Sequence, residues 1–163
     1  MKAIADSVPT KDFEDPRHND EPIEYESELH RALAEDSVGA IESQSCLQVR
    51  SSAPIRQAMQ ALHKSRISVL LVVDDGRVVG TFTERDVLEK VAEQYSRLAG
   101  APVSQVMTAD PAVIWECDPA ATALATIAVT GHRHVPVLSE DGRVQGVVAP
   151  QRVFNFVEKQ FDS

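Results

Sequence analysis

The residues best suited to chemistry form one short turn, Thr83-Glu84-Arg85-Asp86, between an apolar segment and a helix-like one. A hydroxyl and a carboxylate three residues apart at a helix start admit two interpretations. Thr83 can cap the helix while Asp86 reaches back to it, a capping box that contributes about 1 kcal/mol and needs no ligand. Alternatively, Asp86 accepts two hydrogen bonds from a ribose 2′,3′-diol, while the Thr83 hydroxyl and backbone N–H groups face a phosphate.

A second turn, Ala149-Pro150-Gln151-Arg152, repeats this frame 66 residues later without its chemistry. Ala149 has no side-chain group that can cap or donate, and Pro150 removes one N–H from the helix start. Arg152 stands at the carboxylate position and offers no acceptor to a diol. We expect Arg152 to form a surface ion pair, rather than to fill an empty cleft or bind an anion.

Both turns belong to an internal repeat that positions them. Residues 51–91 match residues 116–157, with an offset of 65 where Pro54 pairs with Pro119. The offset becomes 66 after one inserted residue in the second hairpin turn. Two copies of one supersecondary unit indicate that neither copy can bury its apolar face alone.

Each copy predicts the order strand, helix, strand, strand, helix. The first helix of each copy starts after a proline, which a helix start tolerates, and an Asp-Gly pair closes the hairpin. The predicted strands are residues 47–49, 69–73, 78–82, 135–138 and 144–148, the turns are Asp75-Gly76 and Asp141-Gly142, and the closing helices begin at Glu84 and Pro150. A short helix is predicted for residues 23–34, after a tail of residues 1–22. Residues 92–101 join the copies as helix or loop.

The charge distribution argues against nucleic-acid binding. The 163 residues carry a net charge of −9, and residues 1–40 alone hold four Lys/Arg and eleven Asp/Glu, which gives −7. An acidic chain repels phosphate backbones. We interpret the acidic segment as a solvated arm, with docking on a basic partner as the alternative.

The remaining bulk features predict a cytoplasmic protein without a membrane segment. The apolar run of residues 69–73 is far too short to cross a bilayer, and we recognise no secretory signal. The two cysteines, Cys46 and Cys117, show neither a CxxC pair nor Cys/His metal spacing. We therefore predict two free thiols and no metal site.

The two blocks HKSRISVLLVVDDGRVVGTFTERD and TGHRHVPVLSEDGRVQGVVAPQR, with VSQVMTADPAVI opening the second copy, resemble a tandem pair of CBS (cystathionine β-synthase) domains, or Bateman module. The resemblance covers about residues 45–158. It implies an α/β (α+β) fold of two β-α-β-β-α repeats packed face to face with pseudo-two-fold symmetry. The expected divisions are residues 1–40 (acidic tail and short helix), 41–98 (first CBS domain) and 99–163 (second CBS domain). It also implies two clefts between the sheets, adenosine-containing ligands and a homodimer of modules.

The resemblance assigns roles to particular residues. Thr83, Arg85 and Asp86 fall where the family binds ribose and phosphate, whereas Ala149 and Arg152 depart from that pattern, so the second cleft is not expected to bind ribose in the usual way. Cationic residues before the second-copy strand resemble phosphate contacts in nucleotide-sensing modules, namely Arg133, with its bidentate guanidinium, and His134, for which half-buried packing is the alternative. Ile67 and Ser68 lie where the family grips adenine, although Ile67 is equally explained as a core residue.

The expected function is regulatory. The chain would bind AMP, ADP, ATP, S-adenosylmethionine or a similar adenosine ligand in one cleft, and occupancy would bias its homodimer or a regulated protein that the sequence does not name. The alternative is a structural or protein-interaction dimer that binds no ligand. No nucleophile motif, glycine-rich phosphate loop or paired carboxylates are recognisable, so we predict no enzymatic activity and no required cofactor.

Overall fold

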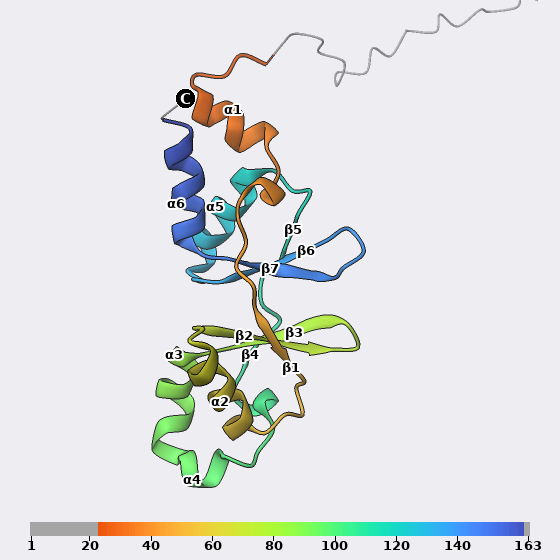
Figure 1. Ribbon diagram of the computed structural model, residues 1–163, viewed down its shortest axis with the longest axis vertical. Helices are drawn as coiled ribbons and strands as arrows, with labels where there is room; N and C mark the ends of the chain where they lie inside the picture. Colours follow the sequence, from red (N-terminus) through yellow and green to blue (C-terminus); the bar gives the residue numbers. More distant parts are fainter. Residues whose placement is uncertain (1–22, 162–163) are drawn as a thin grey trace, which may run out of the picture.

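The computed structural model describes residues 23–161, so the predicted tail of residues 1–22 lies outside the described part of the chain. Two halves are stacked along the long axis (Figure 1). Each half is a sheet covered on its outer side by helices, and the two sheets face each other in the middle. The predicted α/β fold of two face-to-face repeats is therefore confirmed.

The first repeat builds a four-stranded sheet in the order β1-β2-β3-β4. β1 runs parallel to β2, and β2 and β3 form an antiparallel hairpin. Its elements are β1 (Leu47–Val49), α2 (Ile55–Ser65), β2 (Val69–Asp74), β3 (Arg77–Thr83), α3 (Glu84–Asp86), the π-helical η2 (Val87–Val91), η3 (Ala92–Gln94), α4 (Tyr95–Leu98), η4 (Val103–Gln105) and β4 (Thr108–Ala109). The closing helix of this repeat is thus a succession of short helical pieces.

The second repeat has the same topology in a three-stranded sheet of order β5-β6-β7. β5 is parallel to β6, and β6 is antiparallel to β7. Its elements are β5 (Ile114–Trp115), α5 (Ala120–Thr130), β6 (Val135–Leu138), β7 (Val144–Val148) and α6 (Pro150–Lys159). Here the closing helix is continuous.

The segment before the first repeat connects both halves. α1 (Glu28–Glu35) and η1 (Val38–Ala40) bring Ala32, Val38 and Ile41 into the core of the second repeat. Gln44 then forms an isolated bridge with Val147 of β7, and the chain continues into β1 of the first sheet. Figure 1 shows this segment running from α1 past β7 to β1.

β2 shows why the repeats fold together. Leu70 and Val72 belong to the core cluster of the first repeat, whereas Val69 and Leu71 pack with Val147 of the second. Successive side chains of a strand point to opposite faces. The unbroken apolar run of residues 69–73 is therefore a strand covered on both faces, one of them by the other repeat.

Most predicted elements are confirmed. The strands predicted at residues 69–73 and 78–82 are slightly longer, at Val69–Asp74 and Arg77–Thr83, and the start of the first helix is wrong for a local reason. The strands at residues 47–49, 135–138 and 144–148 match residue for residue. The helix predicted from Ile23 begins at Glu28, because Ser27 caps it and its Oγ accepts a hydrogen bond from His30 N at 3.1 Å. Helix periodicity alone does not show where a capping side chain starts the first turn.

Candidate ligand-binding site between the two repeats

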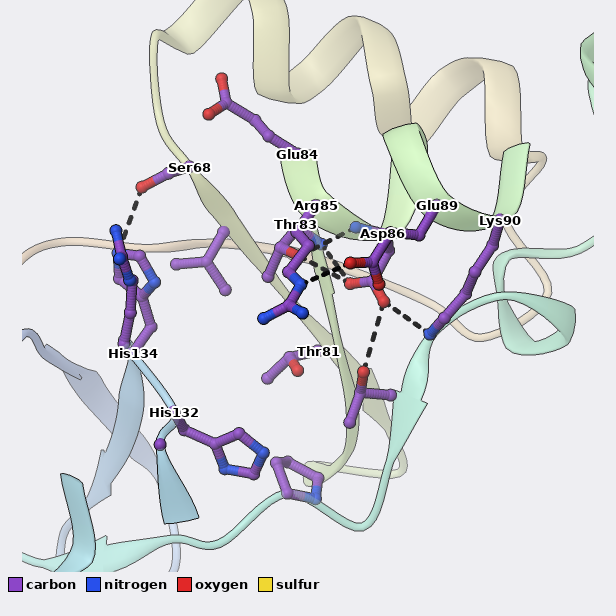
Figure 2. A pocket seen from close by; sticks show the side chains of 15 residues that line it. Ser68, Thr81, Thr83, Glu84, Arg85, Asp86, Glu89, Lys90, His132 and His134 are labelled. Carbon is purple, nitrogen blue, oxygen red and sulfur yellow. Dashed lines mark hydrogen bonds and ion pairs between the residues drawn. The ribbon is translucent and has the colours of Figure 1, made fainter. Parts of the chain in front are cut away.

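A cavity of about 590 Å³ lies between the repeats. Its volume falls within the range of small-molecule sites. The first repeat contributes Ser68, the turn 83–86, Lys90 and Thr108, and the second contributes residues 131–134. Segments that are far apart in the sequence therefore form opposite walls of one cavity (Figure 2).

Asp86 forms one wall and is almost fully buried, with 6% exposure. The predicted capping box is present: Asp86 Oδ2 accepts hydrogen bonds from Thr83 N at 2.8 Å and from Thr83 Oγ1 at 2.7 Å. Asp86 N donates to Thr83 Oγ1 at 3.2 Å. The Thr83 hydroxyl, which the ribose-phosphate interpretation directs to a phosphate, is thus engaged with Asp86 in this state.

The other carboxylate oxygen of Asp86 is also occupied. Lys90 Nζ lies 2.6 Å from Oδ1, and Thr108 Oγ1 donates to the same oxygen at 3.3 Å. Lys90 Nζ donates as well to Val106 O at 2.9 Å. Figure 2 shows the Lys90 side chain reaching Asp86 from the same helical segment. Lys90 and Thr108 were missed from the sequence, although Lys90 stands at the i+4 spacing that favours an ion pair with Asp86.

The opposite wall carries positive charge. Arg133 is exposed, and among residues 23–161 no carboxylate lies within ion-pair distance of its guanidinium. Arg85 lines the same cavity but pairs with Glu89, with Arg85 Nε 2.7 Å from Glu89 Oε1. An unpaired guanidinium matches a phosphate or carboxylate geometrically. Arg133 is therefore the cationic side chain in the cavity best placed to receive an anion.

His134 joins the two walls. Its Nε2 lies 3.1 Å from Ser68 Oγ of the first repeat, as Figure 2 shows. Burial and the neighbouring Arg133 guanidinium lower the pKa of His134, against an opposing effect of the Glu84 carboxylate. The imidazole is therefore held toward its neutral form, in which one ring nitrogen can accept a hydrogen bond.

Six of the seven predicted binding residues line this cavity: Ser68, Thr83, Arg85, Asp86, Arg133 and His134. The exception is Ile67, which packs against the core of the first repeat and is not among the lining residues. Its proposed contact with adenine stays a prediction. His132, which also lines the cavity, was not singled out from the sequence.

The second turn, residues 149–152, differs from the first turn, residues 83–86, as the sequence predicts. Arg152 Nη1 lies 2.9 Å from Glu42 Oε2, which confirms the expected ion pair. Ala149 makes no side-chain cap, and Pro150 takes the first position of α6. Phe156 stands where the first repeat has Lys90 and is buried in the core of the second repeat. The second turn therefore lacks both the acceptor and the cation of the first.

The sequence pattern of the CBS domain matches residues 38–93 and again residues 103–159. The chain belongs to the CBS-domain family. Each match contains the first helix and the hairpin of one structural repeat, α2 to β3 in the first match and α5 to β7 in the second, so the predicted tandem pair of CBS domains is confirmed. Family membership of this kind identifies a module that is usually regulatory.

Curated relatives share part of this chain. An uncharacterized 17.7 kDa protein of Acidianus ambivalens is 29% identical over 102 residues, covering 62% of this chain and 60% of the relative. The CBS domain-containing protein CBSCBSPB5 of Arabidopsis thaliana is 32% identical over 99 residues, 60% of this chain and 18% of the relative. In both cases the match spans less than two thirds of the relative's own length.

Solved CBS structures have the same fold. The CBS-domain containing protein ATU1752 from Agrobacterium tumefaciens is 28% identical, with a TM-score of 0.63 over 74% of this chain and 98% of its own. PAE2072 from Pyrobaculum aerophilum, complexed with AMP, has a TM-score of 0.64 at 21% identity, over 76% and 98%. The CBS domain pair of MJ0100, complexed with 5-methylthioadenosine and S-adenosyl-L-methionine, has a TM-score of 0.63 at 24% identity, over 76% and 96%.

Three further findings concern the described CBS repeats. Within residues 23–161, no group of three or more His, Cys, Asp or Glu side chains is arranged to hold a metal ion. In the same part of the chain, every helix is too short or too polar to span a bilayer. Both cysteines carry free thiols, and burial raises the pKa of Cys46.

Proposed function

We propose that this protein is a regulatory CBS module that binds one adenosine-containing ligand in the cavity between its repeats. The observation that carries the proposal is that one cavity of about 590 Å³ holds both a buried carboxylate, Asp86, and a guanidinium, Arg133, that has no carboxylate partner among residues 23–161. A ribose diol needs hydrogen-bond acceptors, and a phosphate or an amino-acid carboxylate needs cationic donors. The two side chains supply one of each.

Solved relatives support adenosine as the ligand class. PAE2072 binds AMP, and MJ0100 binds 5-methylthioadenosine and S-adenosyl-L-methionine in its CBS domain pair. These ligands share an adenosine moiety and differ beyond the ribose. We therefore assign the ribose to Asp86 and the adenine to Ser68 and Ile67, and leave the variable group to Arg133, Arg85, His132 and His134.

Such a ligand would act as a regulator because it contacts both repeats. The ribose contact lies on the first repeat, and Arg133 and His134 lie on the second. A ligand shifts a conformational equilibrium by its difference in affinity for the two states. Binding would therefore favour the spacing of the repeats at which Asp86 and Arg133 reach the ligand together. This role requires no catalysis.

We further propose that the module forms a homodimer through α5. The outward stripe of α5 carries Leu124 at 44% and Val129 at 86% exposure, with Ala125 and Ala128 exposed between them. A surface helix normally has a polar outer face. A two-fold interface places the same patch on both subunits, and an uncharged stripe can meet its own copy without like-charge repulsion.

The matching face of the first repeat argues for the orientation of this dimer. Residues 60, 63 and 64 of α2 correspond to 125, 128 and 129 of α5, and they are Gln60, His63 and Lys64. An apolar stripe placed on this polar face would leave the Lys64 ammonium poorly solvated. We therefore expect the second repeat of one subunit to face the second repeat of the other.

The free thiols of Cys46 and Cys117 support the proposed cytoplasmic location.

One observation favours a second function, a protein-interaction module that binds no ligand. Both oxygens of Asp86 already have two partners each within the protein. A carboxylate with this network is fully explained as a structural cap. In that case the dimer face and the acidic N-terminal segment would carry the function.

Thermal unfolding against a panel of AMP, ADP, ATP, adenosine and S-adenosylmethionine separates the two functions. A ligand at one hundred times its dissociation constant adds about 2.7 kcal/mol to the free energy of unfolding, which is an easily measured shift. We expect a saturable rise in the unfolding temperature with at least one member of the panel. A flat panel at millimolar ligand would refute ligand sensing and leave the interaction module.

A further inference from the structure

We infer that Lys90 is an internal competitor of the ligand, because its ammonium group occupies the Asp86 oxygen that a ribose diol requires. The inference rests on the proposed adenosine site and adds a residue that sets its affinity. Lys90 therefore weakens binding of any ligand that presents a diol, although it is a cation in an anion-accepting cavity.

The hydrogen-bonding capacity of Asp86 carries the first step. A carboxylate has about four lone-pair positions, two on each oxygen. Oδ2 is occupied by the backbone N–H and the hydroxyl of Thr83, at 2.8 and 2.7 Å. Oδ1 is occupied by Lys90 Nζ at 2.6 Å and Thr108 Oγ1 at 3.3 Å. A diol brings two further donors, so it has to displace partners that are already present.

The Oδ1 partners are the ones that can leave. The two Oδ2 contacts form the capping box, and one of them is a backbone N–H fixed by the turn itself. Lys90 is held by a flexible side chain that is 39% exposed, whereas the Asp86 side chain is 8% exposed. A released ammonium can be hydrated because the Lys90 side chain is partly exposed, and the Thr108 hydroxyl can rotate.

The second contact of Lys90 strengthens the competition. Its Nζ also donates to the carbonyl oxygen of Val106 at 2.9 Å, and Val106 is buried in the core of the first repeat. Displacing Lys90 therefore breaks an ion pair and a hydrogen bond at once. Charge-assisted hydrogen bonds are stronger than neutral ones. The hydrogen bonds from the diol to Asp86 therefore have to compensate for the loss of the charge-assisted contacts of Lys90.

The opposite role for Lys90 is a direct contact with the ligand's phosphate. Lys90 lines the cavity, and an ammonium is a common phosphate partner. The two roles predict opposite effects when the charge is removed. Competition predicts tighter binding of a diol-containing ligand, and a phosphate contact predicts weaker binding of a phosphorylated one. Adenosine has the diol and no phosphate, so it isolates the first effect.

The test is calorimetric titration of adenosine, AMP and 2′,3′-dideoxyadenosine into the native chain, Lys90→Met and Lys64→Met. Lys64→Met removes the same charge from the outer face of α2, outside the cavity. We expect Lys90→Met to bind adenosine roughly tenfold more tightly than the native chain, a gain equivalent to about 1.4 kcal/mol. Lys64→Met should match the native chain. The dideoxy analogue should show no gain, because it has no diol to take the vacated oxygen.

Lys90→Gln keeps the measurement informative if Lys90→Met does not fold, because the amide can still donate to the Val106 carbonyl. It should give a smaller gain in the same direction. Unchanged or weaker adenosine binding in a folded Lys90 variant overturns the inference and leaves the proposed adenosine site intact. Absence of binding to every ligand in the native chain and in both Lys90 variants refutes the proposed site itself.

Discussion

Ser68 lies on the first repeat and His134 on the second, and their side chains meet across the boundary between them, with Ser68 Oγ 3.1 Å from His134 Nε2. Each residue lies just before the first strand of its hairpin, β2 or β6. The face-to-face packing of the repeats therefore brings together two residues that lie 66 positions apart. The contact lies at the cavity wall, and one of its partners is a histidine, so the junction of the repeats should respond to pH.

We expect His134 to make the protein less stable as the pH falls below about 6.5, the ordinary pKa of histidine. Burial and Arg133 lower the pKa of His134 in the folded state, although Glu84 opposes them. The unfolded chain then binds more protons between the folded and the unfolded pKa, so the free energy of unfolding rises with pH in this window. Urea unfolding at pH 7.5 and 5.5 measures the effect.

His134→Gln should lose less stability than the native chain between these two pH values. His63→Gln, on the exposed outer face of α2, is the matched control and should follow the native chain. The carboxyls of Asp74 and Asp141 have lowered pKa values, owing chiefly to hydrogen bonds from Ser51 and Ser139, and titrate below this window. An identical pH dependence in His134→Gln and the native chain would contradict the assignment.

We expect Gly146→Ala to destabilise the fold by roughly 1–3 kcal/mol, the usual cost of overpacking. A Cβ at Gly146 would lie 2.6 Å from the backbone carbonyl oxygen of Gln44, where the N-terminal segment crosses β7. Backbone cannot move aside as a flexible side chain can. Gly100→Ala is the control, because a Cβ there meets no atom within 4 Å. Equal free energies of unfolding for the two variants would show that the N-terminal segment packs less tightly against β7 at Gly146 than the 2.6 Å separation indicates.

We expect Val129→Glu to convert a homodimer into a monomer in size-exclusion chromatography with light scattering. Val129 lies at the end of the apolar stripe of α5, and a carboxylate there would face its own copy across a two-fold interface. Lys64→Glu alters the corresponding position of α2 and should leave the dimer intact. Dissociation by Lys64→Glu alone would place the interface on the first repeat instead.

The backbone was largely predictable from this sequence because the signals are local and repeated. The strand at residues 144–148 and the hairpin at Asp75-Gly76 follow from β-branched residues and turn chemistry. Asp75 and Gly76 have φ values of 48° and 78°, as such a two-residue turn requires. The first helix and the hairpin were also visible in both copies of the repeat, so each copy supported the assignment of the other.

The side-chain contacts of the site were less predictable because several join distant segments. Thr108 contacts Asp86 from β4. The short helical segments between the two residues have no clear periodicity in the sequence, so their path could not be predicted. The ion pair of Lys90 with Asp86 was predictable, because the two residues are four positions apart. Its hydrogen bond to the Val106 carbonyl oxygen was not, because that contact depends on how the chain returns to the sheet. Ile67 shows the converse, because an apolar residue beside a site can equally belong to the core.

The most direct test of ligand sensing is calorimetric titration of the panel ligand that stabilises the protein most, comparing the native chain with Arg133→Gln and Arg56→Gln. Arg56 is exposed on α2 and does not line the cavity, so its variant controls for the lost charge. We expect a one-to-one complex per chain and an affinity loss of roughly tenfold or more for Arg133→Gln alone, as for a charge-assisted contact worth at least about 1.5 kcal/mol. Equal affinities for the three proteins would contradict a ligand held between Asp86 and Arg133.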